Sequence, residues 1–116
     1  MGFDFEVNEV GAPGAMILRI QGNLDSKSTP VFLRHCHQVK AAGRNLVLNL
    51  SDVQFIASSG IGGLLALRED FEEAGLGVRY AALSSAVESV INLLNLGAFL
   101  GIDPTEDEAL SSLAAQ

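Results

Sequence analysis

The stretch from Leu46 to Leu50 constrains the fold more than any other part of this chain. Four of its five residues are aliphatic, and a short apolar run of this kind is typical of a strand buried on both faces of a sheet. Strands covered on both sides occur where helices pack on the two faces of a sheet. We therefore expect an α/β architecture built around this strand.

The N-terminal segment predicts a β-hairpin. Phe3, Phe5 and Val7 alternate with acidic or polar residues, which is the period of a half-buried strand. The turn-forming residues 11–14 then lead into a second apolar run, Met16 to Ile20. Two such runs joined by a glycine- and proline-containing turn favour antiparallel pairing.

Helices are expected before and after the central strand in the sequence. Thr29 supplies a cap and Pro30 a first residue for a helix over about 30–42, which Gly43 ends. The strand from Leu46 continues to Ile56 and leads into a second helix. The expected elements after that are a helix at 59–74, a strand at 78–83, a helix at 86–96 capped by Ser84, a short strand near 99–102, and a C-terminal helix that begins at Asp103-Pro104.

The predicted pattern is ββαβαβα with one further short strand. It describes one domain over residues 1–116, an α/β sandwich in which a mixed sheet of four to five strands packs against about four helices. The apolar fraction of 48% provides enough material for a core.

Charge and cysteine content restrict the partners and the compartment. The net charge of −7, with no cluster of Lys or Arg, opposes binding to nucleic acid. A single cysteine, Cys36, and no signal-peptide pattern at the N-terminus favour a cytoplasmic location. The most hydrophobic stretch, 81–102, is interrupted by six Ser, Asn and Glu residues, so we expect no direct insertion into a membrane.

No pattern in the sequence predicts an enzyme, a metal site or a cofactor. The residues of His35-Cys36-His37 point about 100° apart on a helix and cannot close on one metal ion, which predicts a core cysteine and surface histidines. The glycines of 60–63 lack the spacing of a dinucleotide fingerprint and the Lys-Ser/Thr pair of a P-loop. No Gly-x-Ser-x-Gly elbow surrounds Ser58, and nothing places a base beside it.

The serine pair Ser58-Ser59 is the candidate functional feature. It lies where the central strand is expected to turn into a helix, with three glycines nearby. One interpretation is helix capping, because a serine hydroxyl satisfies free backbone N–H groups at such an end. The other is a presented surface that a second protein contacts.

A family resemblance favours the second interpretation without removing the first. The stretch from Leu46 through Asp52-Val53-Gln54-Phe55-Ile56-Ala57-Ser58-Ser59-Gly60-Ile61-Gly62 resembles the signature of the anti-sigma factor antagonists, bacterial members of the STAS domain family. The residues Gly22-Asn23-Leu24-Asp25 are similar to a second marker of that family. The resemblance extends over nearly the whole chain.

This resemblance implies a regulatory binding protein. Members bind an anti-sigma factor, which is usually also a serine kinase of the histidine-kinase-like ATPase type, and thereby release a sigma factor. Phosphorylation of the first serine of the motif breaks that binding, and a phosphatase restores it. By position the phospho-acceptor is Ser58, and the partner-binding residues are Asp25, Ala57, Ser58, Ser59, Gly60 and Ile61.

Two positions depart from the family pattern. The family usually has an acidic residue where this chain has Ala57, and commonly Glu where it has Asn23. Both changes remove negative charge near Ser58 and bear on its recognition by a kinase. A second function is therefore carried forward, that of an unphosphorylated STAS scaffold or subunit of a signalling or membrane transport complex.

Overall fold

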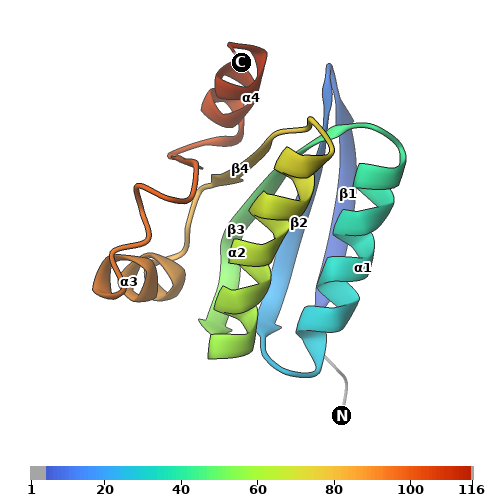
Figure 1. Cartoon of the computed structure of the whole chain (residues 1–116). Helices are drawn as coiled ribbons and strands as arrows, with labels where there is room; N and C mark the ends of the chain where they lie inside the picture. Colours follow the sequence, from blue (N-terminus) through green and yellow to red (C-terminus); the bar gives the residue numbers. More distant parts are fainter. Residues whose placement is uncertain (1–4, 116) are drawn as a thin grey trace.

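The computed structural model describes residues 5–115, and these form one five-stranded sheet with four helices (Figure 1). The predicted Phe3 lies outside the described residues. The elements follow in the order β1 (Glu6–Ala12), β2 (Ala15–Leu24), α1 (Ser28–Ala41), β3 (Asn45–Ile56), α2 (Ser58–Glu73), β4 (Val78–Ala81), α3 (Ser85–Leu93), β5 (Ile102–Asp103) and α4 (Glu106–Ala114).

The sheet is mixed, and its spatial order β1-β2-β3-β4-β5 follows the chain. The predicted hairpin is confirmed, since β1 pairs antiparallel with β2 around a turn in which Gly14 has a φ of +79°. The other three pairings are parallel. The carboxyl ends of β2 and β3 therefore meet at the same edge of the sheet, where Leu24 is paired with Ile56.

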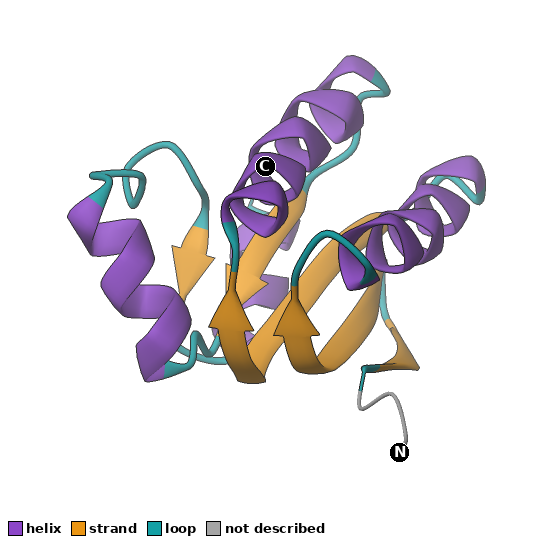
Figure 2. Cartoon of the chain, turned by 90° about the horizontal axis from the view of Figure 1, so that it is seen from below, coloured by secondary structure: helices purple, strands orange, loops and turns teal. Residues whose placement is uncertain are grey.

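Two apolar layers lie on opposite faces of the sheet. Helices α1 and α2 lie side by side over one face, which the two views show from the front and from below (Figures 1 and 2). They cover the larger core, to which α3 adds Val87 and Ile91. On the other face α4 packs Ala109 and Leu113 into a smaller cluster with Val47. The Leu46–Leu50 strand is thus covered on both sides, as its sequence predicts.

Several predicted boundaries are wrong. Helix α1 begins at Ser28, and Thr29 is a buried residue of its first turn instead of its cap. The last strand is β5 at Ile102–Asp103, later than predicted, and α4 is capped by Thr105, whose side chain accepts the Glu108 N–H. The prediction missed these points because several polar residues in a row can each serve as a cap, and tertiary packing selects among them.

Hydrogen bonds to two acidic residues, Asp103 and Glu106, connect α4 to the sheet. Glu106 accepts two hydrogen bonds from Arg19, at 2.8 and 2.9 Å, and a third at 2.7 Å from the Asn49 amide. The bonds from Arg19 and Asn49 lower the pKa of Glu106, although partial burial opposes them. For Asp103, burial raises the pKa, but bonds from Arg79 and Ser112 outweigh it, so that the pKa is lowered.

We expect Thr29→Val to stabilise the fold. The Thr29 hydroxyl is buried and has no hydrogen-bond partner among the described residues, and such a group costs about 1 kcal/mol or more. Thr105→Val is the matched control, because it removes the α4 cap and should destabilise by about 1 kcal/mol. Urea unfolding of both variants measures the direction of each change in the free energy of unfolding. A destabilised Thr29→Val protein would contradict the burial argument.

The α4 attachment should depend on pH. Because the folded pKa of Glu106 is lowered from its ordinary value of 4.5, its contribution is complete above that value and is lost as the pH falls through the lower folded pKa. Glu106→Gln should lower stability at neutral pH and make the acid decline shallower. Arg19→Gln should act in the same way, and the double variant should lose little more than either single one, as measured by urea unfolding from pH 7 to pH 3.

Candidate functional site

The Ser58 site forms where β3 turns directly into α2. Ala57 is still extended, with φ −88° and ψ 171°, and α2 begins at the next residue. The Ala57 N–H donates to the Leu24 carbonyl at 2.8 Å, while its own carbonyl accepts the Ile61 N–H at 3.0 Å. Sheet pairing therefore fixes one side of the turn and the first helical hydrogen bond fixes the other. The predicted strand-to-helix junction is confirmed.

Ser58 and Ser59 are both exposed at the start of α2. Within residues 5–115 neither hydroxyl has a hydrogen-bond partner, and α2 has no side-chain cap. The expectation that one serine caps the helix is therefore wrong. Ser58 is the first helical residue, and the capping position before it holds the methyl group of Ala57.

The first turn of α2 is also free of negative charge. It contains no acidic residue, whereas the first turn of α4 has three and that of α3 has Glu88. The backbone N–H groups of Ser58, Ser59 and Gly60 precede the first helical bond, which is donated by Ile61. This end of α2 therefore presents partial positive charge beside the exposed serines, and no acidic side chain of its own first turn offsets it.

Gly60 lets the first turn of α2 lie directly on the sheet. A Cβ at this position would be 2.8 Å from the Ile56 side chain and 2.9 Å from the Leu24 carbonyl oxygen, and the latter belongs to backbone that cannot swing aside. Ile61 next to it is buried in the larger core. Gly60 and Ile61 therefore fix the position of the turn that exposes Ser58.

Asp25 lies beside this turn. Leu24 and Ile56 are paired at the ends of β2 and β3, and Asp25 and Ala57 are the residues that follow them. Its carboxylate accepts the N–H groups of Lys27 and Ser28 at 2.9 and 3.0 Å, while the Ser28 hydroxyl accepts the Asp25 N–H at 2.9 Å. This reciprocal pair holds the turn that leads into α1, whose own capping position, Lys27, has no side-chain cap. The two N–H groups, that of Ser28 foremost, lower the pKa of Asp25, so the carboxylate is ionised at neutral pH.

The six residues predicted for partner binding thus come together at one edge but differ in exposure. Ser58 and Ser59 are exposed, Asp25 and Ala57 are half-buried, and Gly60 and Ile61 are buried. A second protein can touch the first four directly. Gly60 and Ile61 can act only through the backbone that they position.

The His35-Cys36-His37 triplet separates as predicted. Cys36 is fully buried, and burial raises the pKa of its thiol. His35 Nδ1 lies 3.2 Å from a carboxylate oxygen of Glu9 on β1, and His37 Nε2 lies 3.4 Å from Asp70 on α2. Residues 5–115 contain no group of three His, Cys, Asp or Glu side chains placed to hold a metal ion.

Sequence reasoning missed exposed apolar side chains at the end of α3 and beyond it. Leu93, the last residue of α3, is 80% exposed, and Leu94, which follows it, is 50% exposed. Phe99 is also exposed, with the Arg68 guanidinium 6.0 Å from its ring centre. The helix predicted to run to residue 96 ends at Leu93, so helical periodicity continued beyond that residue misjudges which side chains are buried.

A comparison with protein families identifies the fold. The model of the STAS domain matches residues 6–109. This chain belongs to the STAS domain family. None of the helices in residues 5–115 has both the length and the apolar character needed to cross a membrane.

Solved structures of similar fold agree with this assignment. An anti-sigma factor antagonist from Mycobacterium paratuberculosis is 25% identical, with a TM-score of 0.85 over 95% of this chain and 94% of that one. The Bacillus cell fate determinant SpoIIAA, in its phosphorylated form, is 20% identical, with a TM-score of 0.68 over 93% and 97%. The murine anion transporter Slc26a9 shares the fold at 20% identity and TM-score 0.68, over 89% of this chain but only 18% of the transporter.

We expect opposite effects from alanine at two neighbouring glycines of α2. Gly60→Ala should destabilise the fold by about 1–3 kcal/mol, because its Cβ meets the Leu24 backbone. Gly62→Ala should stabilise it by up to about 1 kcal/mol, because a Cβ there meets nothing within 4 Å and alanine favours helix. Urea unfolding measures both effects, and equal effects would show that α2 does not approach β2 this closely.

Proposed function

We propose that this STAS domain is an anti-sigma factor antagonist that acts by binding and not by catalysis, and that phosphorylation of Ser58 switches its binding off. The observation that carries the proposal is the Ser58 hydroxyl, exposed and without a hydrogen-bond partner among the described residues, at the first residue of α2. A kinase can reach such a group without unfolding its surroundings. The similar fold of an anti-sigma factor antagonist supports the assignment.

The proposed partner is an anti-sigma factor that is also a serine kinase of the histidine-kinase-like ATPase type, in the cytoplasm, with a phosphatase that restores binding. It would contact Ser58 and Ser59, and beside them the half-buried Asp25 and Ala57. Release of a sigma factor follows, because the anti-sigma factor binds this surface instead. The buried Gly60 and Ile61 fix the position of this surface against the sheet and the core.

The switch acts on binding and leaves the fold unchanged. A phosphate adds about −1.5 to −2 charges at neutral pH. Inside this fold it would lie at the start of α2, where no acidic side chain of the first turn opposes it and a helix N-terminus stabilises an anion by about 0.3–1 kcal/mol. In an interface with no cationic partner it would be desolvated and unpaired, at a cost of about 2–5 kcal/mol.

Ala57 and Asp25 set the charge around the switch. With alanine at 57, Asp25 supplies the acidic group beside the junction, and its carboxylate is held by the α1 backbone. A kinase that recognises an acidic residue immediately before the serine would meet the uncharged Ala57 instead. We therefore propose that recognition depends on the shape of the junction and on Asp25.

A second candidate is a STAS scaffold that is not phosphorylated. Two observations favour it, the alanine at 57 and the similarity of the fold to a part of the anion transporter Slc26a9. This domain would then dock constitutively through the same edge, as a subunit of a signalling or membrane transport complex. Whether the charge at residue 58 changes binding separates the two candidates.

We expect Ser58→Asp to abolish capture of the partner and Ser58→Ala to preserve it. The penalty of about 2–5 kcal/mol corresponds to a loss of roughly thirty- to several-thousand-fold in affinity. Each variant is used as bait in cell extract of the source organism, and bound proteins are identified by mass spectrometry. Ser111→Asp is the control, because it adds the same charge at an exposed position of α4, on the other face of the sheet.

The same experiment decides between the two candidates. Equal capture by the Asp and Ala variants supports the scaffold and contradicts the switch. Loss with Ser58→Asp alone, together with one phosphate mapped to Ser58 in protein isolated from growing cells, supports the switch. Urea unfolding is the control for folding, and we expect the Asp variant to be as stable as the unmodified protein or slightly more stable.

A further inference from the structure

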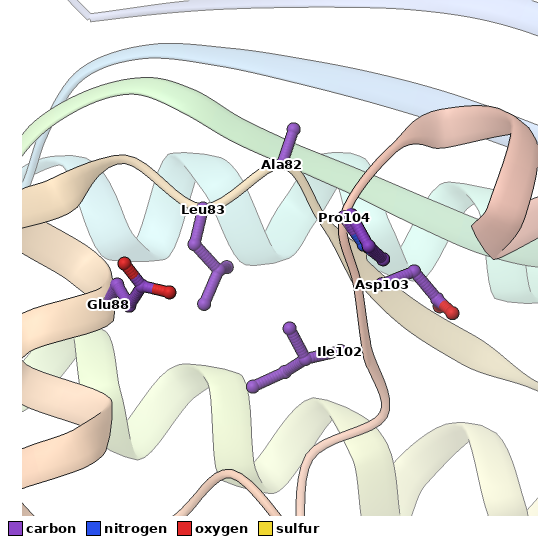
Figure 3. A pocket seen from close by; sticks show the side chains of 6 residues that line it. All are labelled: Ala82, Leu83, Glu88, Ile102, Asp103 and Pro104. Atoms are coloured by element: carbon purple, nitrogen blue, oxygen red, sulfur yellow. The ribbon is translucent and has the colours of Figure 1, made fainter.

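A recess lies away from Ser58, outside the carboxyl ends of β4 and β5. It has a volume of about 420 Å³ and is lined by Ala82, Leu83, Glu88, Ile102, Asp103 and Pro104 (Figure 3). This volume is within the range of small-molecule sites. β4 and β5 are parallel neighbours, so the recess lies beyond the same ends of both strands.

This recess is separate from the proposed switch. The chain leaving β4 is tied to the middle of β3, where the Ser84 N–H donates to the Leu50 carbonyl at 3.2 Å. From Leu50 the strand runs on to Ile56 before Ser58 follows, and those six steps cover about 20 Å. A ligand in the recess therefore does not occupy the surface around Ser58.

The backbone at the recess is held in an unfavourable conformation. Ala82 has a φ of +54°, in the left-handed region that residues with a side chain rarely adopt. Its N–H donates to the Asp103 carbonyl at 3.0 Å, which holds the turn against β5. This turn sends Leu83 into the space that Ile102 borders from the other side (Figure 3).

The charges of the recess select the sign of a ligand. Of the six lining residues two are acidic and none is basic. Asp103 is already compensated by Arg79 at 2.7 Å and by Ser112 at 2.8 Å, and its carboxylate points away from the space (Figure 3). Glu88 is exposed and lies at one end of the space, and its carboxylate has no partner among residues 5–115.

We propose that this recess binds a small organic cation, an amine on a short apolar body. The apolar part lies between Leu83 and Ile102, and the ammonium group pairs with the Glu88 carboxylate. Charge complementarity favours a cation, because Glu88 is the one carboxylate of the lining that has no ion-pair partner among residues 5–115. The apolar side chains favour a hydrocarbon body over a bare metal ion.

The test uses three probes of one shape on the whole chain: 2-phenylethylammonium, neutral 2-phenylethanol and anionic 3-phenylpropionate. We expect the ammonium probe to shift the amide NMR signals of Leu83, Glu88 and Ile102, with a dissociation constant on the order of 1 mM or below. The alcohol should bind about tenfold more weakly, and the anion should give no shifts there.

Two variants make the result specific. Glu88→Gln should weaken the ammonium probe by about tenfold, whereas Glu69→Gln, which removes an exposed charge from α2, should leave it unchanged. Equal binding of the ammonium and the alcohol, equal effects of the two variants, or shifts spread over the acidic residues of α2 and α4 would each overturn the proposal. The three probes test the charge preference even where a variant changes the local structure.

Discussion

The parallel pairing of β2 with β3 is the constraint on which the site depends. It brings Leu24 beside Ile56, so that the chain leaves both strands at one edge and starts α1 and α2 there. The bond from the Ala57 N–H to the Leu24 carbonyl extends this pairing by one residue beyond the strand. Gly60 then lets the helix close onto the same carbonyl, since any larger residue would meet it at 2.9 Å.

The helix that follows is left open at its start. Helices α3 and α4 receive a side-chain cap from Ser84 and Thr105. Helix α2 has no side-chain cap and no acidic residue in its first turn. An anion at this end would meet unsatisfied N–H groups and no opposing carboxylate of that turn, which is why a phosphate there is compatible with the fold and acts, in our proposal, on the partner.

The two faces of the sheet have different roles. The larger core under α1 and α2 fixes the edge that carries Ser58. On the other face, the smaller cluster under α4 is supplemented by charged groups, with Arg19 and Asn49 on Glu106 and with Arg79 and Ser112 on Asp103. Arg79 and Ser112 thereby also pair one of the two acidic groups that line the recess beside β5. Glu88 is the other, and its carboxylate remains without an ion-pair partner among residues 5–115.

Local patterns in the sequence determined the order of the elements, the buried central strand and the junction at Ser58. These depend on the periodicity of neighbouring residues and on a motif of adjacent residues, which one chain displays directly. Only the tertiary structure decided that Thr29 is buried and does not cap α1, that Ala57 stands at the cap position of α2, that Leu94 is exposed and that Glu88 faces a recess. Each of these depends on contacts between segments far apart in the chain, such as Leu24 with Ala57 and Ala82 with Asp103, and no local pattern encodes them.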